Sequence, residues 1–196
     1  GTTATASEIT NLDNKTSGNI TLSGTSMTIT VASGETLNLS WGTNSLSGTL
    51  TINDSTGNEN IKGTSANDTL TLSSGNDTIN LGNGDDTINV ANMSDLTSAD
   101  TITDTITDTS GTDTLNINGS GTIASSDFIV SGFEKLNLST GADVVTFTDK
   151  SSFDTFKSKF SSAVDTKGGD DEFKFSSAIT EDLDFSKPDL IQMKKE

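Results

Sequence analysis

Short alternations of apolar and polar residues recur along the chain, and each follows a segment rich in glycine and asparagine. In the stretch TLTLSSGNDTINLGNGDDTINV, apolar residues come in pairs two positions apart, such as Ile79 with Leu81 and Ile88 with Val90. A period of two places both members of a pair on one face of a β-strand. Glycine and asparagine favour tight turns because they adopt positive φ at little cost. The pattern therefore predicts short strands joined by turns, with threonine and asparagine stacked in rows on the polar face.

The alternation repeats every nine residues. Residues 63–89 divide into the nonamers GTSANDTLT, LSSGNDTIN and LGNGDDTIN, and the same frame extends upstream through DSTGNENIK. Seven acids occupy the sixth position of this frame: Glu59, Asp68, Asp77, Asp86, Asp95, Asp104 and Asp113. A unit of nine residues cannot bury its apolar face alone, whereas stacked copies can. The repeat therefore predicts a parallel β-solenoid.

The nonamers resemble the RTX (repeats in toxin) family, whose pattern is G-G-x-G-x-D-x-U-x with a large apolar residue at U. The resemblance is closest at GNGDDTIN, and Leu72 and Leu81 replace the first glycine of the pattern. It covers residues 54–116 and, more loosely, 129–146. It implies an all-β, right-handed parallel β-roll in which two nonamers form one coil and calcium binds between turns on the same side.

A glycine-rich turn that ends in an acid offers the carboxylate and carbonyl oxygens that calcium prefers. The resemblance implies that Asp68 and Asp86 share one ion, and that Asp77 pairs with Glu59 or Asp95 on the opposite side. The expected metal ligands are Asp68, Asp77, Asp86, Gly75, Gly84, Asn76, Asp85, Glu59, Asp95 and Asp113. The alternative is that these acids are solvated turn residues of a metal-free solenoid. Stacked acids only ~5 Å apart repel one another without a cation, which favours the calcium interpretation.

We expect the N-terminal flank to add further solenoid or sandwich strands, and the C-terminal flank to close the solenoid. Residues 1–53 contain alternating strands, with no acid at the sixth position from residue 18 onwards, and lead into the β-roll of residues 54–148. Residues 149–196 form a C-terminal cap. Within this cap, residues 151–164 carry phenylalanines at helical spacing after Ser151 or Ser152, which can cap a helix. We expect one short amphipathic helix that covers the end of the solenoid.

Composition limits both the core and the chemistry. Leucine, isoleucine, valine and phenylalanine number 44 of 196 residues, only just above the ~20% expected of a disordered, highly charged chain. The core is therefore thin. The chain has no cysteine, histidine or arginine, which excludes disulfides, Cys/His zinc sites and a Ser-His-Asp triad. A net charge of −17 disfavours nucleic acid and anionic membranes as partners.

These features together predict a calcium-dependent structural module of a secreted bacterial surface protein, of surface-layer type, with no enzymatic activity. Two other roles remain open: a section of a large type I-secreted adhesin, and the calcium-binding C-terminal domain of a secreted enzyme. Ice binding, suggested by the alternating threonines of TITDTITDT, is less favoured because the pattern is confined to one stretch. We expect an extracellular location, export without a visible cleaved N-terminal signal, and no membrane insertion. The expected partners are other copies of a surface protein, or cell-surface polysaccharide.

Overall fold

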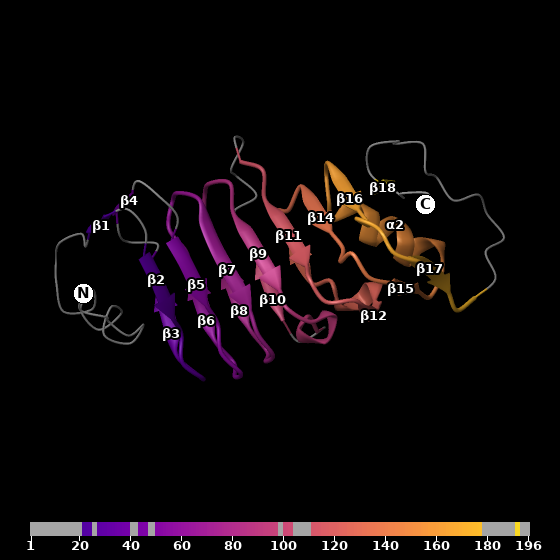
Figure 1. The fold of residues 1–196 in the computed structure, drawn as a ribbon, viewed down its shortest axis with the longest axis horizontal. Coiled ribbons are helices and arrows are strands. Elements are labelled where there is room, and N and C mark those ends of the chain that lie inside the picture. Colours follow the sequence, from indigo (N-terminus) through magenta and orange to yellow (C-terminus); the bar gives the residue numbers. More distant parts are fainter. Residues whose placement is uncertain are drawn as a thin grey trace.

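The computed structural model describes residues 21–24, 27–39, 43–46, 50–97, 100–103, 111–177 and 191–192, and it is an elongated stack of β-coils (Figure 1). The strands are β1 (Thr21–Gly24), β2 (Met27–Thr30), β3 (Thr36–Asn38), β4 (Thr43–Leu46), β5 (Leu50–Asn53), β6 (Asn60–Lys62), β7 (Asp68–Leu72), β8 (Thr78–Asn80), β9 (Thr87–Val90), β10 (Thr101–Thr103), β11 (Thr114–Ile117), β12 (Gly121–Ala124), β13 (Val130–Ser131), β14 (Lys135–Asn137), β15 (Asp143–Phe147), β16 (Ala163–Asp165), β17 (Glu172–Phe175) and β18 (Ile191–Gln192). The helices are α2 (Lys150–Ser158) and the 3₁₀ turns η1 (Met93–Asp95) and η2 (Ser125–Asp127).

From β5 to β11, successive strands alternate between two parallel sheets, while β1 and β4 pair in a separate two-stranded sheet. One sheet has the order β18-β16-β14-β11-β9-β7-β5-β2, and the other has the order β13-β10-β8-β6-β3. Between β5 and β9, paired residues are 18 apart in sequence, so two nonamers make one coil. The predicted all-β parallel solenoid is confirmed, and its right-handed sense stays a prediction.

Each coil buries the inward-facing apolar residues of its strands. Ile52, Leu70 and Ile88 lie one above the other in neighbouring strands and are fully buried. On the polar face, Asn89, Asn116 and Asn137 form the predicted row. The Asn116 amide donates to Asn89 at 3.0 Å, and the Asn137 amide donates to Asn116 at 2.8 Å. The alternation read from the sequence therefore assigns the two faces correctly.

The regular nine-residue count ends after β9. Beyond this strand, residues that are hydrogen-bonded between neighbouring coils are 21 to 28 positions apart in sequence. The separation grows because η1, η2 and longer loops are inserted. A third, smaller sheet, β12-β15-β17, also appears in this part of the chain. The expectation that the nonamer frame runs unbroken to residue 113 is therefore wrong, even though the coils themselves continue.

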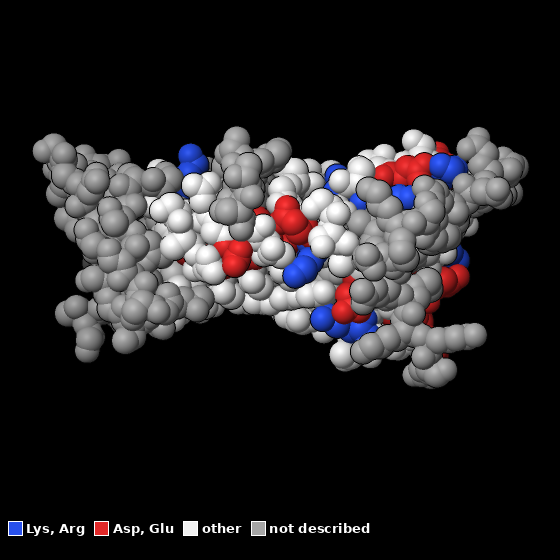
Figure 2. All heavy atoms as spheres, turned by 90° about the horizontal axis from the view of Figure 1, so that it is seen from above, with Lys and Arg blue, Asp and Glu red and all other residues white. Residues whose placement is uncertain are grey.

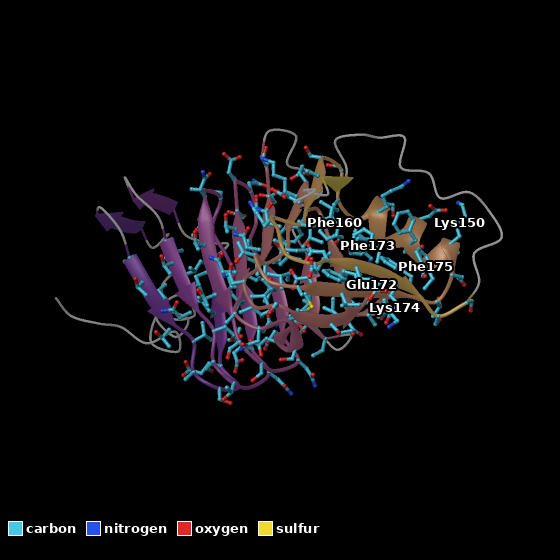
Figure 3. All side chains as sticks on the ribbon, turned by 45° about the vertical axis from the view of Figure 1, so that its right-hand side comes forward. Lys150, Phe160, Glu172, Phe173, Lys174 and Phe175 are labelled. Carbon is cyan, nitrogen blue, oxygen red and sulfur yellow. The ribbon has the colours of Figure 1, made fainter. Side chains whose placement is uncertain are left out.

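The C-terminal end is closed by α2 and a cluster of phenylalanine rings, some of which are labelled in Figure 3. Phe156 lies 5.0 Å from Phe128 and 5.4 Å from Phe147 between ring centroids. The predicted amphipathic helix is present, but it ends at Ser158, and Ala163–Asp165 form β16 instead. Its N-cap is Asp149, which accepts the Ser152 N–H, and not Ser151 or Ser152. The aspartate prevails because its carboxylate receives the first-turn N–H.

The predicted strands at the N-terminal end are confirmed where the structure describes them, as β1, β2, β3 and β5. The eight-stranded sheet runs across both predicted domain boundaries, at residues 53/54 and 148/149, so that division stays a prediction about folding units. Among the described residues, no helix is long and apolar enough to cross a membrane.

Candidate metal centre

A row of four acids runs along the turns that lead into the five-stranded sheet. The strands β3, β6, β8 and β10 pair in register, which aligns the residues just before them: Glu35, Glu59, Asp77 and Asp100. Hydrogen bonds link the row from coil to coil. The Gly34 N–H donates to Glu59 Oε1 at 2.6 Å, the Glu59 N–H to Asp77 Oδ1 at 2.8 Å, and the Asp77 N–H to Asp100 Oδ1 at 2.9 Å. We call this set the first acidic row.

A second acidic row lies at the turns that lead into the eight-stranded sheet. It consists of Asp68, Asp86, Asp113 and Glu134. The N–H of each acid donates to a carboxylate of the next, at 2.7 Å from Asp68 to Asp86, 2.7 Å from Asp86 to Asp113 and 2.8 Å from Asp113 to Glu134. The alignment of Asp68 with Asp86, and of Asp77 with Glu59, on two separate rows is as predicted.

Most of these carboxylates are buried. Glu59, Asp68, Asp77, Asp86, Asp100 and Asp113 each expose 3% of their surface or less. Figure 2 accordingly shows few red side chains over the middle of the face that it presents. Stacked acids lie only ~5 Å apart, so the fold buries like charges side by side. Such an arrangement is unfavourable unless protons or a cation compensate it.

Burial raises the pKa of several of these groups. Desolvation raises the pKa of Asp77 to about 6, and the nearby charges of Glu59 and Asp100 add to this effect. Desolvation also raises the pKa of Asp68 to about 6, although the Thr64 N–H and hydroxyl stabilise its charged form. These carboxyls therefore hold protons more readily than ordinary aspartates. A divalent cation would relieve the same cost.

The glycines of the turns allow close backbone stacking. Gly57 and Gly75 form a parallel bridge, and a Cβ on Gly75 would lie 1.6 Å from the Gly57 carbonyl oxygen. Gly84 has φ of +130°, a conformation that favours glycine. The expected ligands Gly75 and Gly84 therefore lie where neighbouring turns stack closely, and their role as ligands stays a prediction.

Asn76 and Asp85 occupy the fifth position of their nonamers, and both are exposed. The Asn76 N–H donates to the Asn58 side chain at 3.1 Å, and the Asp85 carboxylate accepts the Thr112 N–H at 2.8 Å. These contacts tie neighbouring turns together from outside the acidic rows. Whether Asn76 and Asp85 also bind the ion stays a prediction.

The predicted pairing of Asp77 with Asp95 is wrong. Asp95 lies in η1, where its carboxylate accepts the N–H of Asn92 at 3.1 Å, and Asp100 takes the aligned place. The insertion that contains η1 moves the frame, which counting by nine could not reveal. Asp104 lies outside the described residues. Asp113 and Glu134 belong to the second acidic row. Asp143 and Asp171 form a separate pair at the third sheet, where the Asp143 N–H donates to the Asp171 carboxylate at 2.9 Å.

The sequence analysis missed Glu35, Asp54 and Asp100. Glu35 and Asp100 carry a readable signal, because each directly precedes an alternating strand, as the repeat acids do. Asp54 is an acid at the end of an alternating strand and not at the sixth position. Its carboxylate lies near those of Glu59 and Asp77, and one oxygen from each lies within 4.8 Å of the others.

The group formed by Asp54, Glu59 and Asp77 fits a hard cation. Asp54 Oδ1, Glu59 Oε2 and Asp77 Oδ2 are buried and have no hydrogen-bond donor. Desolvation, with a contribution from the charge of Asp77, raises the pKa of Asp54 to about 7. Buried, unpaired carboxylate oxygens are the ligands that calcium takes in proteins.

A comparison with protein-family models identifies the repeat. The model of the RTX calcium-binding nonapeptide repeat, in four copies, matches residues 54–88. Searches of curated proteins and of solved structures each found no match. The matched residues include Glu59 and Asp77 of the first acidic row and Asp68 and Asp86 of the second. The chain therefore carries RTX calcium-binding nonapeptide repeats over residues 54–88, a structural module whose ion is Ca²⁺.

Proposed function

We propose that this chain is a calcium-dependent structural module of a secreted bacterial surface protein, of surface-layer type, which folds and assembles outside the cell when calcium binds. The observation that carries the proposal is the pair of buried acidic rows within RTX repeats. Calcium, when bound, supplies the positive charge that these rows lack. The chain's own carboxylates and turn carbonyls would hold it.

The mechanism is linkage between binding and folding. Without calcium, burying the two rows opposes stacking of the coils, and the thin apolar core offers little to offset that cost. An ion that binds only the folded state stabilises it by about 2.7 kcal/mol per site at a hundredfold excess over its Kd. Several sites together are therefore sufficient to decide whether a domain of marginal stability folds. In the low-calcium cytoplasm the chain would stay loose, which suits type I secretion.

Charge is distributed unevenly along the chain, which favours a head-to-tail arrangement where copies meet. Residues 1–127 contain 15 acids and 2 lysines, whereas residues 128–196 contain 13 acids and 9 lysines. The blue side chains in Figure 2 accordingly gather toward the C-terminal end. The net charge is therefore −13 (2 − 15) in the first part and −4 (9 − 13) in the second. Contact between the second part of one copy and the first part of another is opposed less by charge than contact between two first parts.

Far-UV circular dichroism of the full chain tests the proposal. In excess chelator we expect little β-structure, and titration with calcium to several millimolar should produce most of the β signal. Magnesium at the same concentrations should produce much less, because it prefers a tight octahedral shell with bound water. A spectrum already rich in β-structure in chelator, and unchanged by calcium, would contradict the linkage mechanism.

Sedimentation of the same samples separates the surface-layer role from the alternatives. Growth of the sedimentation coefficient with protein concentration in calcium supports assembly. A folded chain that stays monomeric at all concentrations instead favours an adhesin section or the tail of a secreted enzyme.

A further inference from the structure

We propose that the stacked turns 54–59 and 73–77 form the tightest calcium site of the array, with Asp54 as a third carboxylate ligand beside Glu59 and Asp77. The inference rests on the proposed calcium-dependent function and deepens it, because it places the site that fills first. Asp54 stands at the first position of its nonamer, where the RTX pattern has glycine. The repeat signature therefore does not assign it a role.

Asp54 occupies a place that the fold otherwise gives to buried apolar residues. The pairing of Asn53 with Thr71 aligns Asp54 with Leu72, and Leu72 in turn pairs with Val90. Leu72 and Val90 are both fully buried. A carboxylate in such a place costs free energy unless a partner compensates it. Packing of the coil alone therefore gives no reason for an acid here.

The described groups of the protein satisfy this acid and its two neighbours only in part. Glu59 and Asp77 expose only 2% and 1% of their surface, and each keeps one oxygen without a donor. Asp54 Oδ2 accepts the Ser73 N–H at 3.0 Å, which directs the carboxylate toward the stacked turn, while its Oδ1 has no donor. Neither of the two ion pairs between described residues involves these acids. The two buried carboxylates and the half-buried Asp54 thus each keep one buried oxygen without a donor, and such a group calls for a cation.

Asp68, on the opposite side of the coil, has a different environment. Asp68 of the second acidic row receives the Thr64 N–H at 2.7 Å and the Thr64 hydroxyl at 3.1 Å, so the protein itself satisfies its carboxylate. The place before it in the row belongs to Leu50, not to an acid. Within the part of the chain that the structure describes, Asp54, Glu59 and Asp77 are the only three carboxylates grouped closely enough to share one ion. Affinity for calcium rises with the number of charged ligands, which makes this turn the tightest site.

Isothermal titration of calcium into the full chain tests the inference, with Asp54→Leu and Asp54→Asn as variants. Leucine restores the residue found at the aligned place in the next coil, and asparagine keeps an oxygen for the Ser73 N–H. We expect each variant to lose one ion from the tightest class, or to weaken that class by at least about tenfold. Glu172→Gln removes one charge from an exposed acid of β17 and should leave the binding curve unchanged.

The outcomes separate this inference from the proposed function. Loss of the tight class in variants that regain the wild-type circular dichroism at saturating calcium supports Asp54 as a ligand. Unchanged stoichiometry and affinity in Asp54→Leu would overturn the inference while the calcium-dependent function stands. A wild-type chain that binds no calcium at all would refute both.

Discussion

The repeat acid Asp77 serves two purposes through its two oxygens. In Asp77, Oδ1 accepts the Glu59 N–H at 2.8 Å and so fixes the turn of the preceding coil, whereas Oδ2 is buried and has no donor. The first oxygen satisfies a backbone group that the turn would otherwise leave unpaired. The second oxygen is left for an ion. One residue type therefore explains both the shape of the turn and its need for calcium.

The raised pKa values predict how the calcium-free protein responds to pH. Asp54 has a pKa of about 7, and Asp68 and Asp77 have pKa values of about 6, all above the ordinary 3.8. A carboxyl that binds its proton more tightly when folded makes the folded state lose stability as pH rises from about 4 to about 7. In chelator we expect more β-structure at pH 5 than at pH 7, with a melting temperature higher by about 5 °C or more.

Saturating calcium provides the control for this measurement. The ion requires deprotonated ligands, so the loss of stability between pH 5 and pH 7 should shrink or reverse when calcium is present. Equal melting temperatures at pH 5 and pH 7 in chelator would show that these carboxyls are not buried together as the structure places them.

At the level of the turn, the short distance between the backbones of stacked turns limits which residues can stand there. The stacked turns place Gly57 against Gly75, and the Asn76 N–H donates to the Gly57 carbonyl at 3.2 Å. No side chain fits between two turns at this separation. The small residue is therefore required for stacking, independently of any ligand role for its carbonyl.

Substitution Gly75→Ala tests this requirement. The new Cβ would fall 1.6 Å from the Gly57 carbonyl oxygen, so one turn must move and the coils separate locally. We expect the melting temperature in saturating calcium to fall by roughly 5–10 °C. The matched control is Gly121→Ala, whose Cβ would make an ordinary contact of 3.6 Å with Met93. A Gly75→Ala protein as stable as this control would contradict the stacking geometry.

Considered as a whole, the molecule is stabilised differently along its length. The middle coils depend on the two acidic rows, whereas the C-terminal end packs phenylalanine rings of β15, β17 and α2 against one another. Aromatic packing needs no ion, because it depends on apolar area and ring geometry. The two parts should therefore respond differently to the removal of calcium.

Hydrogen exchange in chelator and in calcium tests this difference. We expect amides of β6 to β9 to lose protection when calcium is removed, while amides of β15 and α2 keep part of theirs. The comparison within one chain supplies its own control, since both regions experience the same solvent. Loss of protection over all described strands at the same calcium concentration would show instead that the chain folds as one cooperative unit.

The candidate site was readable from the sequence wherever the repeat is regular. Asp68, Asp77, Asp86 and Glu59 follow one another at nine-residue intervals, so the alternate placement on two sides of a two-nonamer coil could be predicted from counting alone. Asp95 could not be placed, because the insertion that contains η1 shifts the frame by an amount that no local pattern encodes. Asp100 takes the aligned place because β10 pairs with β8.

The sequence by itself determined the solenoid, its two-faced strands, its acidic turns and an amphipathic helix near the end. These features depend on local periodicity and turn chemistry, which are written within a few consecutive residues. Only the tertiary structure decided which acids meet outside the regular repeat positions. The grouping of Asp54 with Glu59 and Asp77 depends on the register between coils and on the strand end that turns Asp54 toward them. Contacts between residues 18 or more positions apart are set by packing, and packing is not visible in any single repeat.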